Sequence, residues 1–434
     1  MKRKTVGAIA AAASFALLGL SACSSDPAAI DITGPPDTLW NEARDGMAGQ
    51  PWVVGLGDSY ISGEGGRWAS NGTDNAQFSG TGGWLLGTVD QVYGDAPDGT
   101  ETIPFCHRTA TAPMFIGEGW NSKNLACSGA KTGSFVSTDN RLKPGIDFAD
   151  STTGAGQLVG QAKRLQESAA TNDVKVVALS IGGNDLGFSD IIGACVTGWL
   201  KPGKTLCSDS ETVAKNINPE TKKIVKEKIT AAVFNVNRAM RAAGKEPSDW
   251  RLVYSVPPSP IPLAADIDYP DTGYSRQSVG GCGIHDEDLD FANKVILPFV
   301  KDAIDGGLQG ARKLPDMAPI TVLDNSNAPN GHRLCETGTT RPPAGTGLPP
   351  DALGNEVEWV RFLSLDIELQ HPEVPDAIEA MHPTYFGQRV LGSCMRAAVE
   401  SPASTPELSC TRPSDAEFTG SGLDVLTPVQ VSGP

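Results

Sequence analysis

With 434 residues, 39% of them hydrophobic and 20% charged, the chain has the composition of a globular protein with a sizeable core, and intrinsic disorder is excluded. Its net charge is −16 and no cluster of Lys and Arg stands out, so nucleic acid is not an expected partner. The length by itself allows two or three domains.

The first 22 residues indicate a targeting signal that is not part of the fold. Basic residues at positions 2–4 precede an apolar run over 6–20, and the segment ends in Leu-Ser-Ala before Cys23. This arrangement is typical of a secretory signal, and the run is too short for an ordinary transmembrane helix. Leu-Ser-Ala-Cys resembles a bacterial lipobox, which implies cleavage before Cys23 and a diacylglycerol on its sulfur. The alternative is an ordinary secretory signal with a chance cysteine.

Residues 23–50 are predicted to form a flexible tether between this anchor and the folded domain. They contain Ser, Asp, Pro and Gly with little periodicity. Two or more acyl chains hold a protein stably on a membrane. The expected location is therefore extracytoplasmic in a bacterium, with the membrane as a partner through lipidated Cys23.

Apolar runs further along the chain predict the strands of a buried parallel sheet. They occupy residues 51–56, 174–181, 251–256 and 319–324, with a weaker candidate at 359–367. Helical periodicity lies between them, over 158–169, 219–243 and 289–303, the last with an expected kink at Pro298. Strands alternating with helices predict an α/β fold with a parallel sheet.

Three stretches interrupt this alternation. Residues 66–104 are rich in Gly, Asn, Asp and Thr but contain several aromatic side chains, and residues 338–356 are rich in Pro and Gly. Residues 411–434 are predicted to be an irregular C-terminal tail. The aromatic residues of the first stretch form either a lid or acyl slot, or simply pin a long loop to the body, and we favour pinning.

A serine follows the first predicted strand. In "VVGLGDSYISGEGG", residues 53–66, the apolar run ends in Gly57-Asp58-Ser59. The carboxyl end of a strand is where ligands bind in open parallel sheets. Ser59 is thus either a nucleophile or the cap of a following helix.

Asn184 occupies a matching place after the second strong strand. "SIGGNDLGF", residues 180–188, runs from apolar residues into two glycines and then this amide. Taken alone the pattern also fits a helix cap or turn. Two parallel strands would present Ser59 and Asn184 on the same edge of one sheet.

Two further segments complete the set. "LACSGAKT", residues 125–132, moves from an apolar run to a turn of small residues at Gly129, where a backbone N–H is open to a ligand. "EAMHPTYFGQ", residues 379–388, places His382 before a proline, which fits a helix that starts just after the histidine.

Ser59, Gly129, Asn184 and His382, in this order, resemble the SGNH hydrolase superfamily of GDSL esterases and lipases. The segments "GDSYISGEG", "FCHRT", "LACSGAKT", "SIGGNDLGF" and "GHRLC" look like its secreted actinobacterial branch. The resemblance spans residues 51 to about 398. It implies one hydrolase domain, placed at 51–410, with a flavodoxin-like three-layer α/β/α sandwich of about five mainly parallel strands.

The resemblance also implies a role for each matched residue. Ser59 would be the nucleophile and His382 the base that takes its proton and returns it to the leaving alcohol. The backbone N–H groups of Ser59 and Gly129 and the side-chain amide of Asn184 would form the oxyanion hole. This chemistry uses an ester substrate and no cofactor, and a monomer is expected.

One position departs from the superfamily pattern. Three residues before His382, where an aspartate usually orients the imidazole, this chain has Glu379. Either Glu379 is the third catalytic residue, or a backbone carbonyl replaces it and leaves a Ser-His dyad; Asp376 is a weaker candidate. The remaining histidines, at 107, 285, 332 and 371, are interpreted as structural or surface residues.

Eight cysteines remain beyond Cys23, and an even number in an exported protein predicts disulfides. Spacing alone leaves the pairing open, and the absence of CxxC and of paired histidines gives no reason to expect a metal. The resemblance implies Cys106–Cys127, Cys195–Cys207 and Cys282–Cys335, which leaves Cys394–Cys410.

Together these features predict a membrane-anchored extracytoplasmic serine esterase or lipase that works through an acyl-serine. A related alternative is an acyltransferase or deacylase acting on a cell-envelope glycolipid or polysaccharide. An alternative of another class is a catalytically inactive surface-binding lipoprotein that keeps the fold.

Overall fold

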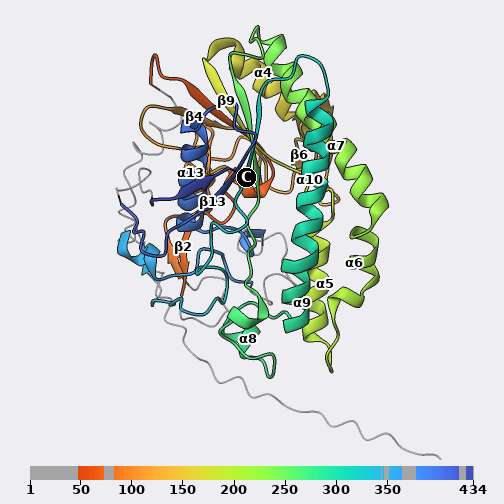
Figure 1. Ribbon diagram of the computed structural model, residues 1–434, viewed down its shortest axis with the longest axis vertical. Helices are drawn as coiled ribbons and strands as arrows, with labels where there is room; N and C mark the ends of the chain where they lie inside the picture. Colours follow the sequence, from red (N-terminus) through yellow and green to blue (C-terminus); the bar gives the residue numbers. More distant parts are fainter. Residues whose placement is uncertain are drawn as a thin grey trace, which may run out of the picture. The chain divides into compact units, whose positions relative to one another are not determined.

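A seven-stranded sheet forms the centre of the structure, a computed structural model that describes residues 47–72, 83–343, 345–346, 351–363, 378–419 and 427–433 (Figure 1). The signal segment, Cys23, most of the tether, His371 and Asp376 lie outside the described residues. Within the described ranges, no helix combines the length and the apolar character needed to cross a membrane.

The strand order in the sheet is β14-β13-β11-β10-β9-β1-β4, and every neighbouring pair is parallel except β13 and β14. The strands are β1 (Trp52–Gly57), β4 (Asn121–Asn124), β9 (Val174–Ser180), β10 (Arg251–Val256), β11 (Ile320–Asp324), β13 (Glu407–Thr411) and β14 (Gln430–Ser432). Gly57 at the end of β1 pairs with Ser180 at the end of β9. The loops that follow these two strands therefore leave the sheet at the same edge.

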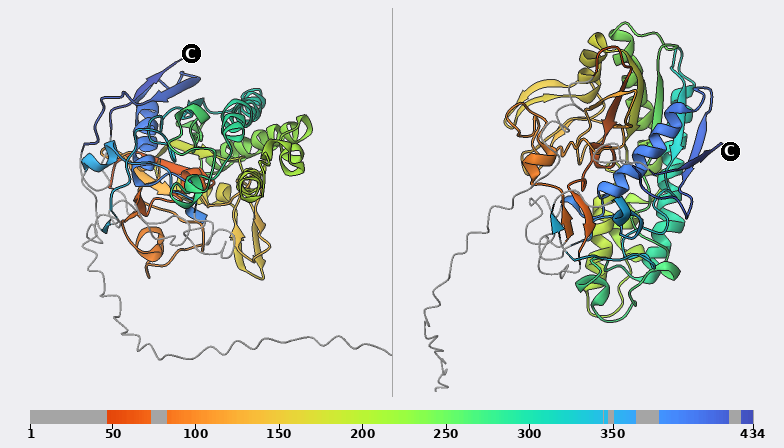
Figure 2. Two further views of the ribbon diagram at one scale, coloured as in Figure 1. Left: turned by 90° about the horizontal axis from the view of Figure 1, so that it is seen from below. Right: turned by 90° about the vertical axis from the view of Figure 1, so that its left-hand side faces the viewer.

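Helices cover both faces of the sheet, because the central strands bury side chains on both sides. Val54 and Leu56 belong to the core cluster that includes residues of α4 (Gln161–Thr171), α7 (Pro219–Ala242) and α10 (Leu297–Arg312), whereas Val53 belongs to the cluster that includes α13 (Tyr385–Glu400). Figures 1 and 2 show α13 in blue and α7 and α10 in green on opposite sides of the strands. The result is the predicted α/β/α arrangement.

The four apolar runs named as strands become β1, β9, β10 and β11, with bounds that differ by one residue or less at each end. The sheet is larger than the predicted five strands because β4, β13 and β14 extend its edges. The prediction of an irregular tail over 411–434 is corrected at Gln430–Ser432, which pairs with β13. The weaker candidate at 359–367 contains no strand in its described part, 359–363, where Val360 makes only an isolated bridge.

The helices follow the predicted periodicity with two corrections. α7 matches the predicted 219–243, with Asn218 as its cap and Pro219 in its first turn. The predicted start at Leu158 is wrong, because Leu158 lies in β8 (Gly156–Val159), which pairs with β7 (Asp150–Thr153), and α4 begins at Gln161. The second correction concerns the predicted helix over 289–303, which is not one continuous α-helix. Before Pro298, residues Ala292–Ile296 form a π-helical turn between α9 (Asp286–Phe291) and α10.

The remaining short elements lie in the connections. The helices are α2 (Ser59–Ser62), α3 (Val89–Tyr93), α5 (Phe188–Leu200), α6 (Glu211–Asn216) and α8 (Ser275–Ser278). Three 3-10 turns occur at Cys207–Asp209, Ala264–Asp266 and Asp351–Asn355. The hairpin of β5 (Phe135–Val136) and β6 (Leu142–Lys143) follows the Gly129 turn.

The two long loops pair with each other. β2 (Trp68–Asn71) and β3 (Gly83–Leu85) come from the stretch 66–104, and β12 (Gly345–Thr346) comes from 338–356 and pairs with β3. Trp68 is 1% exposed, and the Arg361 guanidinium lies 3.6 Å from the centre of its ring. The described part of this stretch is therefore pinned to the body.

All four predicted disulfides are present: the three that the resemblance implied and the pair that these left over. They join Cys106 to Cys127, Cys195 to Cys207, Cys282 to Cys335 and Cys394 to Cys410. Each contributes about 2–4 kcal/mol to stability in chain-entropy accounts. The first one flanks the Gly129 turn and so bears on the site as well.

Candidate active site

Ser59 is the first residue of α2, directly after the turn that ends β1. Gly57 adopts φ +134°, and a Cβ there would come within 1.9 Å of the Ser180 carbonyl oxygen, so the sharp exit from the strand requires glycine. The cap of α2 is Asp58, whose carboxylate accepts the Tyr60 N–H at 3.2 Å. The capping interpretation of Ser59 is thereby corrected, because that role belongs to its neighbour.

His382 lies against the serine hydroxyl although the two residues are 323 positions apart. Its Nε2 is 2.7 Å from Ser59 Oγ, and its Nδ1 is 3.0 Å from the carbonyl oxygen of Ala380. A carbonyl oxygen only accepts, so Nδ1 carries the proton and Nε2 is free to accept the hydroxyl proton. The imidazole thus has the tautomer that a general base for Ser59 requires.

The loop that carries His382 is fixed on both sides. The Tyr60 hydroxyl donates to the Met381 carbonyl oxygen at 3.2 Å, and the Arg361 N–H donates to the His382 carbonyl oxygen at 2.9 Å. Burial lowers the pKa of His382, while the carboxylate of Glu64 opposes this shift. A lowered pKa keeps the ring neutral at neutral pH, so Nε2 remains available to accept a proton.

The Glu379 side chain makes no hydrogen bond to the imidazole, which corrects its tentative role as the third catalytic residue. Its buried carboxylate accepts hydrogen bonds from Arg67 Nε at 2.7 and 2.9 Å, from Trp68 Nε1 at 2.6 Å and from the Tyr93 hydroxyl. These groups occupy the carboxylate, and the backbone carbonyl of Ala380 orients His382. The geometry is that of a Ser-His dyad.

Gly129 and Asn184 lie together, as the sequence pattern predicted. Gly129 adopts φ +74°, in the left-handed region that glycine tolerates, and the Asn184 side-chain amide donates to the Ala130 carbonyl oxygen at 2.9 Å. Among the described residues, no acceptor is found for the N–H of Ser59 or of Gly129. These groups are the donors that the expected oxyanion hole requires.

Asp185 joins the two loops, and the sequence analysis did not single it out. Its carboxylate accepts the Thr132 N–H at 2.9 Å and the Thr132 hydroxyl at 3.0 Å, and it pairs with Lys228 of α7 at 2.9 Å. The available signal was the Asn-Asp pair after β9: the Asn184 amide binds Ala130, and the Asp185 carboxylate binds Thr132, two residues further along the same loop. Asp185 therefore sets the distance between the Gly129 turn and Asn184.

A cavity of about 870 Å³ opens over these groups. Ser59, Gly129, Asn184 and His382 all line it, so the structure brings the four residues of the sequence pattern to one space. Further walls come from α5 and α6 and from the loop before α13, including Phe188, Ile192, Val196, Lys201, Lys215, Leu363 and Met381. No described residue of 66–104 lines it, so the aromatic residues described there form no acyl slot.

Two buried carboxyl groups, those of Asp58 and Glu64, lie close to Ser59 in the sequence. Burial raises the pKa of Asp58 to about 7, although its hydrogen bond from the Tyr60 N–H acts in the opposite direction. Glu64, completely buried, pairs with His107 Nδ1 at 2.7 Å, and the charge of His107 lowers the pKa of Glu64. Ser59 thus sits in a poorly solvated setting, where local charges act strongly.

The other described histidines make structural contacts, as interpreted from the sequence. His107 binds Glu64, and His285 Nδ1 lies 2.9 Å from Asp271. His332 stacks on Trp359 with 3.8 Å between ring centres. None of these three lines the cavity, so His382 is the described histidine available to Ser59.

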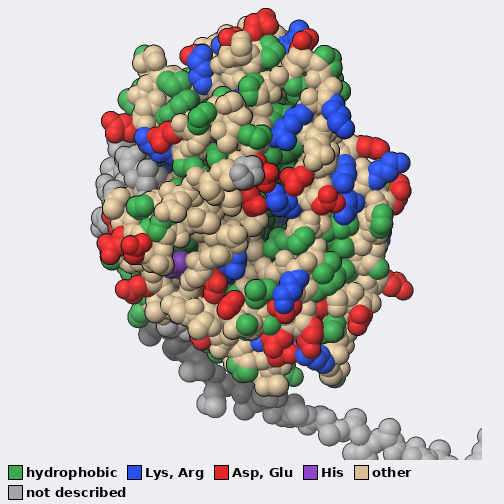
Figure 3. Space-filling view, viewed as in Figure 1, with side chains coloured by type: hydrophobic (Ala, Val, Ile, Leu, Met, Phe, Trp, Pro, Cys, Tyr) green, Lys and Arg blue, Asp and Glu red, His purple; other side chains and the backbone are tan. Residues whose placement is uncertain are grey.

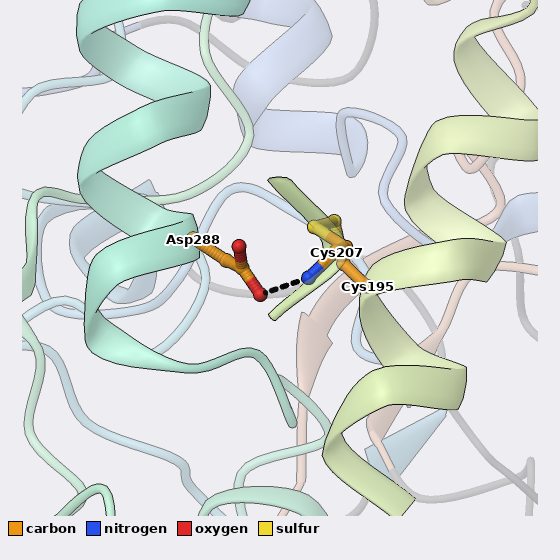
Figure 4. A group of neighbouring side chains, drawn as sticks. All are labelled: Cys195, Cys207 and Asp288. Atoms are coloured by element: carbon orange, nitrogen blue, oxygen red, sulfur yellow. Dashed lines mark hydrogen bonds between the residues drawn. A yellow bond between two sulfur atoms is a disulfide. The ribbon is translucent and has the colours of Figure 1, made fainter. Parts of the chain in front are cut away.

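One group of side chains away from the cavity has the composition of a metal site but different bonding. Cys195, Cys207 and Asp288 lie together in Figure 4, where the two sulfurs form a disulfide. The Asp288 carboxylate accepts the N–H groups of Cys207 at 2.8 Å and Ser208 at 3.1 Å. These interactions fasten the 3-10 turn to α9, and the sulfurs are not thiolates able to bind a cation.

Acidic and basic side chains alternate on the outer surface of α7 and α10. Figure 3 shows Lys and Arg interleaved with Asp and Glu on the side that carries α7 and α10 in Figure 1. Lys222 pairs with Asp302 at 2.7 Å, and Arg241 pairs with Asp316 at 3.0 Å. This face therefore offers no continuous basic surface.

Several solved structures are similar to this chain, although no family model and no curated protein matches it. An extracellular lipase from Streptomyces rimosus and phospholipase A1 from Streptomyces albidoflavus each have 18% identity and a TM-score of 0.38, covering 81% of this chain and 100% of theirs. A lipase from a goat rumen metagenome has 12% identity and a TM-score of 0.34, covering 81% of this chain and 99% of its own. These likenesses are too distant to assign an activity.

Proposed function

We propose that the protein is a serine ester hydrolase of the SGNH type. The observation that carries the proposal is the dyad: Ser59 Oγ lies 2.7 Å from His382 Nε2, and Nδ1 is held on the Ala380 carbonyl. A hydroxyl is a poor nucleophile until a base takes its proton, and this contact provides such a base. The same contact argues against a silent surface-binding protein.

In the first half of the reaction, Ser59 Oγ attacks the ester carbonyl carbon while its proton passes to His382 Nε2. The carbonyl oxygen becomes an oxyanion, stabilised by the N–H groups of Ser59 and Gly129 and by the Asn184 amide. The bond from carbon to the alcohol oxygen then breaks. The alcohol leaves with the proton from His382, and an acyl-serine remains.

In the second half, water attacks the acyl carbon and gives its proton to His382. The carboxylic acid leaves, and the proton returns to Ser59 Oγ. An acceptor hydroxyl from a glycolipid or a polysaccharide would follow the same path in place of water. We propose hydrolysis, with water as the acceptor in the cavity of about 870 Å³ that Ser59 lines.

The test is hydrolysis of p-nitrophenyl esters from acetyl to palmitoyl by the wild type and by Ser59→Ala. We expect activity in the wild type and its loss in the variant. An organophosphonate should label Ser59 and leave Ser189, which lines the same cavity but has no hydrogen bond to any histidine that the structure describes. Full activity in Ser59→Ala, or a label on Ser189 alone, would refute the proposal.

The proposed setting is the outer surface of a bacterial membrane, through a lipid on Cys23. The motif Leu-Ser-Ala-Cys supports the anchor, and four disulfides fit an oxidising compartment. The protein should partition into detergent, and Cys23→Ala should release it or block its processing. A protein that stays in the aqueous phase and whose mature N-terminus lies after Cys23 would contradict this anchor.

A further inference from the structure

Lys143 holds the peptide group that carries the Gly129 N–H. Its Nζ donates to the Ser128 carbonyl oxygen at 2.6 Å and to the Phe105 carbonyl oxygen at 3.0 Å. The Ser128 carbonyl and the Gly129 N–H are the two ends of one peptide group. A Cβ on Gly129 would lie 3.4 Å from Lys143 Nζ, so the ammonium packs directly beside this turn.

We propose that Lys143 is a positioning residue for the oxyanion hole, whose ammonium orients and polarises the Ser128–Gly129 peptide so that the Gly129 N–H becomes a stronger donor. The inference rests on the proposed hydrolase function, since it assigns that N–H to the oxyanion. Lys143 itself does not line the cavity, so it acts through the peptide and does not touch substrate.

The physical reason is the coupling between the two ends of a peptide group. A cation on the carbonyl oxygen draws electron density from the nitrogen and strengthens the N–H as a donor, and hydrogen bonds in a chain reinforce one another. A charge-assisted hydrogen bond is roughly twice as strong as a neutral one. The positive charge also favours the oxyanion through space, because little solvent intervenes.

A purely structural role explains the position of Lys143 less well. The Gly129 turn is already tied down by the Cys106–Cys127 disulfide and by the Ser128 N–H, which donates to the Cys106 carbonyl oxygen at 3.0 Å. Lys143 is 9% exposed, and its ammonium binds two neutral carbonyls, so its charge carries a desolvation cost. A charge kept there at such a cost fits a function that depends on charge.

Burial, together with the charged neighbours of Lys143, sets the pH at which this side chain is protonated. Burial lowers the pKa of Lys143 to about 8, and the nearby Arg141 guanidinium acts in the same direction. The carboxylates of Glu64, Glu101 and Asp139 oppose the shift. Lys143 is thus mostly charged at neutral pH, and it becomes neutral as the pH rises through about 8.

The first experiment compares Lys143→Met and Lys143→Arg with the wild type on p-nitrophenyl acetate. Removing a whole oxyanion donor costs roughly 10²–10³ in kcat, so weakening one should cost about tenfold, with KM little changed. Lys143→Arg should recover most of the activity, because it keeps the charge. Lys131→Met is the matched control, since it removes an exposed charge from the loop that follows Gly129 and should leave kcat unchanged.

The pH dependence separates this role from simple support. In the wild type, kcat should fall as the pH rises through about 8. The tenfold gap between wild type and Lys143→Met should therefore close at high pH, and in Lys143→Arg the alkaline fall should disappear. A structural role would leave the gap constant with pH, and that result would overturn the inference.

A second measurement does not depend on activity and is made on the wild type, with a variant used only to assign one signal. Serine labelled with ¹³C at the carbonyl, combined with ¹⁵N-glycine, restricts the NMR spectrum to Ser–Gly amides, and Ser128→Ala identifies the signal of Gly129. This amide signal should shift in the wild type as Lys143 loses its proton, and a Gly129 signal that stays fixed through that pH range would refute polarisation.

Two outcomes distinguish failure of this inference from failure of the hydrolase proposal. If the signal shifts but the wild type hydrolyses no ester, the hydrolase proposal fails, and the role in an oxyanion hole fails with it. If the enzyme is active while Lys143→Met matches the wild type at every pH, the inference alone fails.

Discussion

The two sides of Ser59 are built on different principles. On the base side, a neutral backbone carbonyl orients His382, and the nearby carboxylate of Glu379 is bound by Arg67, Trp68 and Tyr93. On the oxyanion side, charged Lys143 and Asp185 bind the loop that carries Gly129. Charge therefore supports the framework on the first side, and on the second it reaches the Ser128–Gly129 peptide, whose N–H is the proposed oxyanion donor.

The largest expected effect comes from the base itself. His382→Ala should lower kcat by roughly 10⁴-fold or more, because Ser59 then has no proton acceptor. Hydrolysis of p-nitrophenyl acetate measures the loss, and a thermal melt checks that the fold is retained. Residual kcat within about tenfold of the wild type would mean that another group is the base.

The next effect tests the oxyanion side. Asn184→Ala removes the side-chain donor and should lower kcat by roughly 10²–10³, with KM changed far less, since the oxyanion exists only along the reaction path. Steady-state kinetics on a short-chain ester separate the two constants. An increase in KM alone would show that Asn184 binds substrate and does not stabilise the oxyanion.

A smaller effect should come from the charge that spaces the two loops. Asp185→Asn leaves one acceptor oxygen for the N–H and the hydroxyl of Thr132, so the Gly129 turn loosens and kcat should fall about tenfold. Lys228→Met is the matched control, because it removes only the exposed partner of the same carboxylate and should change kcat little. Equal losses in both variants would place the effect in the ion pair and not in the loop.

The smallest effect on activity, and the largest on stability, is expected at Glu379. Glu379→Gln removes the buried negative charge that accepts hydrogen bonds from Arg67, Trp68 and Tyr93, and it should cost about 3–5 kcal/mol in the free energy of unfolding. kcat should fall less than about tenfold, because the Ala380 carbonyl still orients His382. Urea unfolding and kinetics measure the two effects. A loss of kcat by orders of magnitude with unchanged stability would restore Glu379 as a catalytic residue.

The sequence predicted the parts of the site that depend on local pattern. Apolar runs that end in Gly57 and Gly182 placed Ser59 and Asn184 at one edge, because parallel strands end together. β4 was missed because its residues, Asn-Ser-Lys-Asn, have no apolar run, and its place in the sheet comes from pairing with β1.

Contacts between distant residues were beyond such patterns. Glu379 stands three residues before His382, yet its carboxylate binds Arg67, 312 positions away. Lys143 carries no signal in its neighbourhood, since its role depends on where the β5–β6 hairpin packs against the Gly129 turn. A short spacing in sequence therefore did not predict the partner of the Glu379 carboxylate. The direction of this buried charged side chain is set by partners that are distant in the sequence.

The Cys106–Cys127 disulfide beside the Gly129 turn makes the proposed activity depend on oxidation of these two cysteines. Cys106 and Cys127 clip together the two segments whose carbonyls Lys143 binds, and such a bond does not persist in a reducing cytoplasm. A newly made chain would thus lack a finished oxyanion hole, and it would stay harmless to the esters of the cell that makes it until it is exported. We expect a mild reductant to lower kcat before the protein unfolds, and reoxidation to restore it. An equal kcat in the reduced, folded protein would show that the activity does not require this disulfide.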